Sequence, residues 1–184
     1  MEDAFTVLSQ RIRGSGQRLL IAVDGRCASG KTTLAATLEE ETGCNVVHMD
    51  DFFLRPEQRT PQRLAEPGGN VDYERFRQEV ILPLSRGDQV RYQIFDCQQM
   101  VLSAFREIDP SKTTVIEGSY SCHPALWDFY DLRVFLDIDP EEQLRRIRRR
   151  NGEEKAVMFQ TRWIPMEERY FDAFRLRERC ELIF

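Results

Sequence analysis

Short apolar runs alternate with segments of helical character along the chain. The runs have the length of buried strands, and they occupy residues 19–23, 46–49, 113–116 and 132–138. Helical spacing or helix end signals follow them, at residues 31–41, 72–85, 140–150 and 165–179. Strands of about five residues separated by helices predict an α/β fold with a parallel sheet that is covered on both faces.

Two further strand candidates and one long connection complete this pattern. Residues 89–96 are predicted to form a strand or a two-stranded ribbon, and residues 182–184 a terminal strand. Residues 54–70 contain three prolines, two adjacent glycines and three arginines, and we expect no regular structure there. A connection of that length within a small domain is more often functional than not. We expect residues 1–184 to form one domain.

Acidic residues stand at the ends of the apolar runs. Because the carboxyl ends of parallel strands meet along one edge of a sheet, ligands bind at that edge. We therefore expect a functional site where these ends gather. The strand ends are Asp24-Gly25, Asp50-Asp51, Glu117-Gly118 and Asp137 with Asp139.

The strongest motif follows the first apolar run. Residues 25–32 read Gly-Arg-Cys-Ala-Ser-Gly-Lys-Thr and match G-x-x-x-x-G-K-[ST] at every fixed position. The glycines allow backbone N–H groups to point at phosphate oxygens, Lys31 can reach the β- and γ-phosphates, and the Thr32 hydroxyl can bind Mg²⁺. A chance match in a structural turn is the alternative, but a strand before and a helix after the motif favour phosphate binding. The residues predicted to bind ATP are Gly25, Arg26, Cys27, Ala28, Ser29, Gly30, Lys31, Thr32 and Thr33.

Carboxylates at two other strand ends suit phosphoryl transfer. Transfer to a hydroxyl requires a carboxylate that orients the hydroxyl and accepts its proton, and Asp50 and Asp51 are the candidates. These residues alone do not decide between the two aspartates, and a helix cap or a surface pair is the alternative. Glu117 could bind Mg²⁺ directly or through water, or simply close a turn.

A basic segment lies in the last third of the chain. Residues 141–150 contain five arginines and two glutamates, and Arg146, Arg149 and Arg150 share one helix face by their spacing. Gly152 then loosens the chain. This arrangement suits a lid, at about residues 148–163, that brings guanidinium groups to transferring phosphates. A solvated basic face is the alternative, and RNA binding is disfavoured because no aromatic platform accompanies the arginines.

Composition narrows the class of protein. The chain has 26 basic and 31 acidic residues, so its net charge of −5 disfavours wholesale binding to nucleic acid or to anionic membranes. No apolar stretch approaches the ~20 residues of a spanning helix, and the first twenty residues lack the features of a signal peptide. Five scattered cysteines without metal-ligand spacing are typical of reduced thiols, so we expect a cytoplasmic protein. The sequence does not indicate an oligomeric state.

Together these motifs resemble the uridine kinase–phosphoribulokinase–pantothenate kinase group of P-loop kinases, and within it the uridine kinase-like and nicotinamide riboside kinase-like members. The resemblance runs from about residue 19 to the end of the chain. It implies a three-layer α/β/α P-loop fold with a parallel five-stranded sheet and a short arginine-bearing lid. The segments that carry it are the phosphate-binding loop, Met49-Asp50-Asp51-Phe52-Phe53, Asn70-Val71-Asp72-Tyr73, Val115-Ile116-Glu117-Gly118 and residues 144–151.

The resemblance also implies roles for individual residues. Asp50 is expected to be the catalytic base near the metal, and Asp72 to bind ribose hydroxyls, although Asp72 taken alone reads equally well as a helix N-cap. We expect residues 54–70 to form an acceptor-binding loop. The residues expected to be catalytic are Asp50, Lys31 and Arg149, and those expected to bind Mg²⁺ are Thr32, Asp50 and Glu117. The residues expected to bind the acceptor are Asp50, Asp72, Tyr73, Phe95, Arg146 and Arg150.

The implied function is an ATP- and Mg²⁺-dependent kinase that transfers the γ-phosphoryl group to a hydroxyl of a small molecule, first of all a nucleoside such as uridine. The chain departs from uridine kinases in two places. Its lid lacks a second arginine pair after Arg150-Asn151, and residues 95–99, Phe-Asp-Cys-Gln-Gln, lack the Tyr-Asp and nearby His of the family's base-binding segment. The second departure keeps a non-nucleoside alcohol of the pantothenate or glycerate type as an alternative acceptor. A nucleotide-binding switch is less favoured, because no guanine-reading motif is present.

Overall fold

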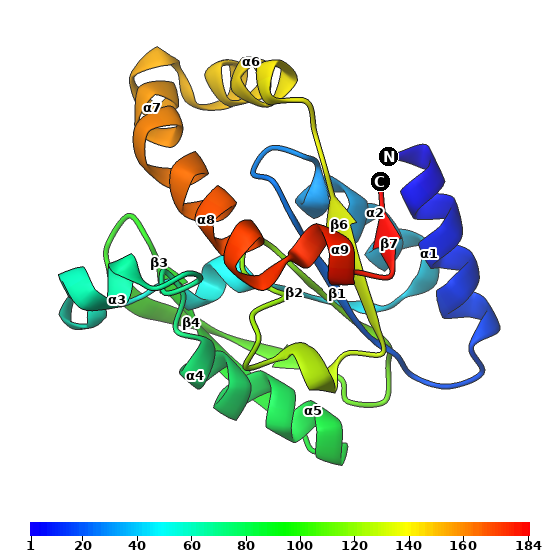
Figure 1. The fold of residues 1–184 in the computed structure, drawn as a ribbon. Helices are drawn as coiled ribbons and strands as arrows, with labels where there is room; N and C mark the ends of the chain where they lie inside the picture. Colours follow the sequence, from blue (N-terminus) through cyan, green and yellow to red (C-terminus); the bar gives the residue numbers. More distant parts are fainter.

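A parallel five-stranded sheet forms the centre of the computed structural model, which describes residues 1–184 (Figure 1). The strand order is β2-β5-β1-β6-β7, and every pairing within this sheet is parallel. The predicted five-stranded parallel sheet is therefore confirmed. The strands are β1 (Leu20–Gly25), β2 (Asn45–His48), β5 (Thr114–Glu117), β6 (Leu132–Leu136) and β7 (Leu182–Ile183).

Helices cover both faces of the sheet, as the alternation of strands and helices predicts. On one face, Ile21 and Val23 of β1 pack with Leu34 of α2 (Lys31–Thr42) and Leu8 of α1 (Glu2–Gly14). On the other face, Ala22 belongs to the cluster formed with the helices on residues 73–86 and 164–179. Successive side chains of a strand point to opposite faces, so β1 supplies both cores and the fold has three layers.

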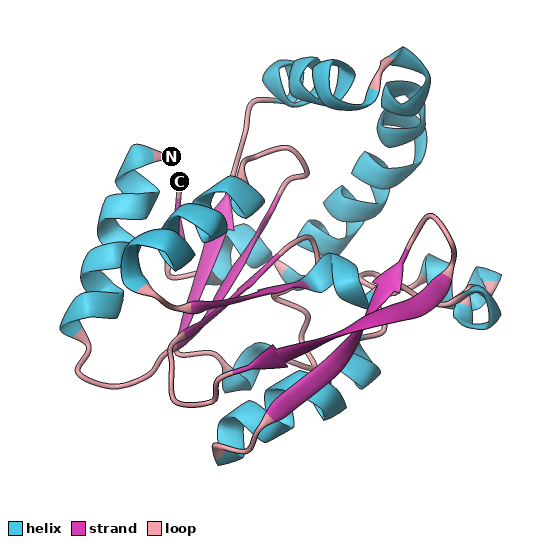
Figure 2. Ribbon diagram, turned by 180° about the vertical axis from the view of Figure 1, so that it is seen from behind, coloured by secondary structure: helices cyan, strands magenta, loops and turns pink.

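The helix predicted for residues 72–85 forms as three consecutive helical segments, α4 (Tyr73–Phe76), the π-helical turn η3 (Arg77–Ile81) and α5 (Leu82–Arg86). A separate antiparallel hairpin of β3 (Val90–Asp96) and β4 (Val101–Ile108) follows it (Figure 2). Of the two alternatives for residues 89–96, the single strand is therefore confirmed, and its partner strand lies outside these residues. Residues 101–108 have no apolar periodicity because β4 is largely exposed, and sequence reasoning missed this second strand.

Residues 54–70 are not structureless, so that expectation was wrong. They contain the 3-10 helix η2 (Pro56–Gln58) and the helix α3 (Pro61–Ala65), which Thr60 caps by accepting a hydrogen bond from the Arg63 N–H. The Arg63 guanidinium also donates to the carbonyl oxygens of Gly69 and Val71. Local capping and one arginine therefore order a segment whose composition suggested a loop.

The last third of the chain rises beyond the carboxyl end of β6 and returns to the sheet (Figure 1). No helix has the length and apolar character needed to cross a membrane. The helix predicted for residues 165–179 is interrupted at Arg175, whose φ of 51° lies in the left-handed region. The elements are α6 (Pro140–Asn151), α7 (Glu153–Met158), the π-helical turn η5 (Phe159–Trp163), α8 (Ile164–Phe174) and α9 (Leu176–Arg179). Short 3-10 helices η1 (Met49–Phe52) and η4 (Trp127–Phe129) follow β2 and precede β6.

Candidate active site

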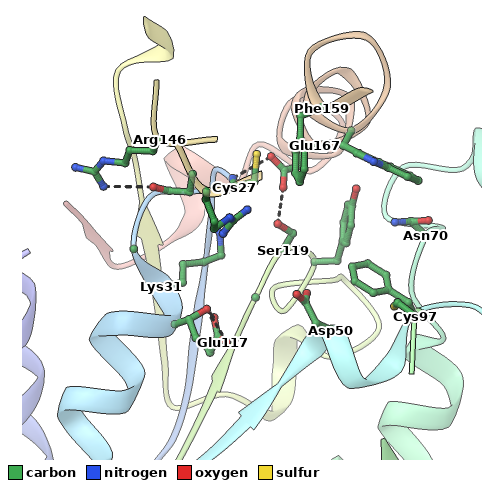
Figure 3. Close-up of a pocket in the computed structure, with 18 of the residues that line it drawn as sticks. Cys27, Lys31, Asp50, Asn70, Cys97, Glu117, Ser119, Arg146, Phe159 and Glu167 are labelled. Atoms are coloured by element: carbon green, nitrogen blue, oxygen red, sulfur yellow. Dashed lines mark hydrogen bonds between the residues drawn. The ribbon is translucent and has the colours of Figure 1, made fainter. Parts of the chain in front are cut away.

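One cavity of about 1060 Å³ lies at the carboxyl ends of the strands, as the sequence predicts (Figure 3). Its lining comes from the glycine-rich loop and α2, from the ends of β2 and β5, from residues 54–70, from the hairpin tip and from α6, η5 and α8. Eleven of the predicted site residues line it. They are Cys27, Ala28, Gly30, Lys31, Thr32, Thr33, Asp50, Glu117, Arg146, Arg149 and Arg150.

The glycine-rich loop curls between β1 and α2 with its first glycine pressed against the neighbouring strand. Gly25 has φ of 125°, and a Cβ there would lie 2.1 Å from the carbonyl oxygen of Leu136. The Lys31 Nζ donates to the carbonyl oxygens of Gly25 at 2.7 Å and of Arg26 at 2.8 Å, so the ammonium group is held within the loop. A concave backbone and a fixed cation of this kind form an anion-binding site.

Oxygen donors gather next to this loop. The Thr32 hydroxyl donates to the Glu117 carboxylate, with both carboxylate oxygens at 3.2 Å, and Glu117 is buried. His48 Nδ1 lies 2.5 Å from Glu117 Oε1, and this hydrogen bond raises the pKa of His48. A hydroxyl with one or two carboxylates fits Mg²⁺, which binds few protein oxygens and completes its shell with water and phosphate oxygens. No cluster of three or more His, Cys, Asp or Glu side chains exists that could hold a metal by itself.

Asp50 and Asp51 differ in what they face. Asp50 lines the cavity, whereas Asp51 accepts a hydrogen bond from the Tyr92 hydroxyl at 3.0 Å and does not line it. Asp50 is solvent-exposed where it lines the cavity. Desolvation by the surrounding cavity walls and the nearby Glu117 carboxylate raise the pKa of Asp50 to about 6. The structure thus distinguishes two neighbours that the sequence leaves equivalent.

Three of the five arginines of α6 reach the cavity, and they are the three that share a predicted helix face. Arg146 pairs with Glu142 at 2.7 Å and donates to the carbonyl oxygen of Ala28 in the glycine-rich loop at 3.3 Å. Arg149 makes no ion pair. Cations at the end of α6 therefore face the phosphate-binding side of the cavity.

Several predicted site residues do not line the cavity. Asp72 is buried and caps α4 by accepting from the Arg75 N–H at 3.0 Å, so its N-cap interpretation is confirmed. Tyr73 instead stacks on His123 with ring centroids 3.9 Å apart, and Phe95 is buried in the hairpin. The acceptor-binding roles of these three residues stay predictions. Within the loop, Gly25, Arg26 and Ser29 do not line the cavity either.

Arg26 is turned away from the cavity by two acidic partners. Its guanidinium pairs with Asp137 at 2.9 Å and donates to Glu168 of α8 at 3.1 Å. The side chain therefore ties the loop to the end of β6 and to α8, and only its backbone remains available to a phosphate.

Sequence reasoning missed other cavity residues, among them the buried Glu167. It is buried on α8 and accepts hydrogen bonds from the Cys27 N–H at 3.0 Å and from the Ser119 hydroxyl (Figure 3). Nothing in its helical surroundings marks it as a site residue. Other cavity residues that were not predicted individually include Arg59, Asn70, Cys97, Met100, Phe159 and Trp163. All of these except Met100 lie in the segments 54–70, 95–99 and 148–163, which the sequence did indicate.

A parallel sheet with this strand order, with a G-x-x-x-x-G-K-[ST] loop between β1 and α2 and carboxylates at the neighbouring strand ends, defines a P-loop protein. The model of the AAA domain family matches residues 21–164. The chain therefore belongs to the AAA domain family.

Relatives by sequence bear kinase names. Residues of this chain are 28% identical over 152 positions to uridine kinase-like protein 3 of Arabidopsis thaliana, covering 77% of this chain and 32% of that protein. They are 24% identical over 176 positions to the uridine kinase of Chlamydia pneumoniae, covering 85% of this chain and 78% of that protein. The chain thus spans about a third of the Arabidopsis protein. The resemblance to uridine kinase-like proteins is confirmed.

Two solved structures share the fold over nearly the whole chain. One is described as a possible uridine kinase from Bacillus stearothermophilus, with a TM-score of 0.76, 23% identity and coverage of 100% of this chain and 98% of that chain. The other, from Silicibacter sp. TM1040, is provisionally named a fructose transport system kinase, with a TM-score of 0.76, 22% identity and coverage of 98% of both chains. These similarities confirm the α/β P-loop fold.

Proposed function

We propose that this protein is an ATP- and Mg²⁺-dependent kinase that transfers the γ-phosphoryl group to a hydroxyl of a small molecule. The observation that carries the proposal is that Asp50 and the P-loop face one cavity. A phosphate-binding loop by itself serves many functions, but a carboxylate beside it provides the base that hydroxyl phosphorylation requires. The relatives named as kinases support a phosphotransferase.

Each element of the site has a role in this reaction. The P-loop and Lys31 hold the triphosphate, and Thr32, Glu117 and Asp50 are the residues that would hold Mg²⁺. The metal, when bound, neutralises charge on the phosphates. Asp50 orients the acceptor hydroxyl and takes its proton. The bond between the γ-phosphorus and its bridging oxygen breaks as the bond to the acceptor oxygen forms, and ADP leaves.

We further propose that residues 148–163 act as a lid and that Arg149 stabilises the transferring phosphoryl group. Arg149, Arg150 and the aromatic residues Phe159 and Trp163 line the cavity from this segment. Closure over the nucleotide would exclude water and so favour transfer to the acceptor over hydrolysis. Residues 54–70 supply the opposite wall through Arg59 and Asn70, in agreement with an acceptor-binding segment.

Two acceptor classes follow from the sequence and its relatives. A nucleoside such as uridine is the first to test, because the relatives bear the name uridine kinase. A non-nucleoside alcohol of the pantothenate or glycerate type is the second, because the hairpin segment Phe95–Gln99 lacks the side chains with which uridine kinases read a base.

The proposal is tested by ADP release from ATP and Mg²⁺ in the presence of a panel of nucleosides and other alcohols. With the acceptor that stimulates release, Asp50→Asn should lower kcat by about 10²- to 10⁴-fold while the affinity for ATP changes little. Asp51→Asn is the matched control, since Asp51 does not line the cavity, and it should keep most of the activity. Full turnover in Asp50→Asn would refute the role of Asp50. Slow hydrolysis that no acceptor stimulates would favour a nucleotide-dependent switch.

A further inference from the structure

Arg59 is a cationic side chain that lines the cavity but belongs neither to α2 nor to α6. Arg59 belongs to the segment between η2 and α3, on the wall formed by residues 54–70. Asn70, from the end of the same segment, lines this wall together with Cys97 of the hairpin tip. Figure 3 shows Asn70 and Cys97 on one side of the cavity and Lys31 and Arg146 on the other, with Asp50 between them. The wall that holds Arg59 therefore lies across Asp50 from the phosphate-binding loop, on the side where the proposed reaction requires the acceptor.

The Arg59 guanidinium is held in place without a carboxylate partner. Its Nε donates to the carbonyl oxygen of Leu54 at 2.9 Å, which fixes the side chain and leaves both terminal nitrogens free. The other two arginines of the segment are paired, Arg55 with Glu57 at 3.4 Å and Arg63 with Glu74 at 2.7 Å. Arg59 is partly buried, and a desolvated guanidinium without an anion leaves its donors poorly satisfied.

Asn70 supplies a second unpaired polar group on the same wall. The residue is 7% exposed and lines the cavity, and its side-chain amide makes no hydrogen bond within the protein although its polar atoms are open to the cavity. Only its backbone carbonyl is used, as the acceptor for the Leu54 N–H at 3.3 Å. An unpaired amide that is open to a cavity is available to a ligand as both donor and acceptor.

The charges around this wall distinguish it from the nucleotide side. Desolvation raises the pKa of the Cys97 thiol, and Asp50 and Arg59 both lie close enough to shift this pKa in opposite directions, Asp50 raising it and Arg59 lowering it. A ligand seated among these three residues would meet a carboxylate base at one end and a free guanidinium at the other. This is the pattern expected for a ligand that has a hydroxyl at one end and an anion at the other.

We infer that the acceptor is a hydroxy compound that also carries a carboxylate or a phosphate, and that Arg59 and Asn70 bind this anionic group. The inference rests on the proposed kinase function and narrows its acceptor. An unmodified nucleoside has no anionic group, so it would occupy the site and leave the Arg59 guanidinium without an anionic partner. A carboxylate or phosphate would accept paired hydrogen bonds from the planar guanidinium, which is the geometry that arginine recognises best.

Matched pairs of acceptors test the inference in the kinase assay. The pairs are glycerate and glycerol, pantothenate and pantothenol, and ribose 5-phosphate and ribose, with uridine as the neutral nucleoside. The anionic member of at least one pair should have the higher kcat/KM. For that compound, Arg59→Gln should raise the acceptor KM by about 10- to 100-fold with little change in the KM for ATP, and Arg59→Lys should restore part of the loss. Arg91→Gln, an exposed arginine of the hairpin strand β3, is the control for loss of one positive charge.

A second measurement reports binding without turnover. Cys97 is the one exposed cysteine of the five, so its alkylation by iodoacetamide can be followed by mass spectrometry. With ADP present, the anionic compound should slow alkylation of Cys97 in the wild-type protein but not in Arg59→Gln, and its neutral partner should have no effect. The carboxylate and phosphate members of the panel distinguish the two anions.

The outcomes separate the inference from the proposed function. Efficient phosphorylation of uridine or another neutral alcohol that Arg59→Gln leaves unchanged would overturn the inference and retain the kinase. A raised KM for ATP in Arg59→Gln would assign Arg59 to the nucleotide and also overturn it. Protection of Cys97 without turnover of any acceptor would support the anion site and count against the kinase. Neither protection nor turnover with any anionic compound would overturn the inference.

Discussion

The Glu167 carboxylate accepts a hydrogen bond from the backbone N–H of Cys27, at 3.0 Å, although 140 residues separate the two. Glu167 also accepts from the Ser119 hydroxyl, so α8, the P-loop and the end of β5 are joined at one buried side chain. Burial and the Glu167 carboxylate raise the pKa of the Cys27 thiol to about 12, which keeps this thiol protonated. A carboxylate thus already lies beside the loop that we propose binds the triphosphate.

Removal of this charge should strengthen nucleotide binding. Glu167→Gln keeps an oxygen acceptor for the Cys27 N–H but eliminates repulsion with the phosphates, so the Kd for ATP should fall by about 3- to 10-fold, as measured by calorimetry. Glu178→Gln, at an exposed residue of α9 that does not line the cavity, removes the same charge and should leave the Kd unchanged. An unchanged or higher Kd in Glu167→Gln would contradict the repulsion.

The lid arginines should differ in their contribution to turnover. Arg149 lines the cavity without an ion pair, whereas Arg145 of the same helix is exposed and pairs with Glu142. Arg149→Gln should lower kcat by about 10²- to 10³-fold, because charge on the transferring phosphoryl group would lose a cation. Arg145→Gln should retain wild-type kcat. Equal effects of the two changes in a steady-state assay would show that the basic face acts only through its net charge.

Gly25 should tolerate no side chain. In Gly25→Ala the new methyl group would meet the backbone of Leu136 and the residue would keep a positive φ, so we expect a loss of about 2–5 kcal/mol in the free energy of unfolding. Gly43→Ala is the matched control, because Gly43 also has a positive φ, 69°, but has open space around it. Its loss should be about 1 kcal/mol. Urea denaturation followed by circular dichroism would measure both, and similar values would argue against a steric cause.

Stability should fall in mild acid because of His123. Burial lowers the pKa of this stacked histidine to about 4, so the unfolded state binds a proton at higher pH than the folded state does. The neutral His123 side chain makes its full contribution to the free energy of unfolding above its unfolded-state pKa, near 6.5. This contribution is lost as the pH falls toward 4, and the free energy of unfolding decreases by about 3 kcal/mol in all.

His123→Gln isolates this effect. The variant should show a smaller fall in the free energy of unfolding between pH 6.5 and 4 than the wild-type protein, whatever its stability at pH 7. Identical pH dependence in the two proteins would exclude His123 as the source of the acid sensitivity.

Much of the fold follows from local pattern. The parallel strands, the helix after the P-loop and the helix that Asp72 caps could be predicted, because strand and helix periods and capping residues act over a few positions. The hairpin strand β4 could not be predicted in the same way, because it is largely exposed and leaves no clear apolar period. The helix α1 was missed although Ala4, Leu8 and Ile12 lie at helical spacing and pack against the sheet.

The sequence by itself determined the P-loop, the carboxylates at the strand ends and the basic face of α6, since each is written in contiguous residues whose spacing dictates its chemistry. Only the tertiary structure decided that Asp50, and not Asp51, faces the cavity, and that Asp72 is used as a cap. It alone brought Glu167 to Cys27, and Arg59 and Asn70 to the opposite wall. The physical reason is that a side chain's partners depend on which distant segments pack against it, and no local period records that packing.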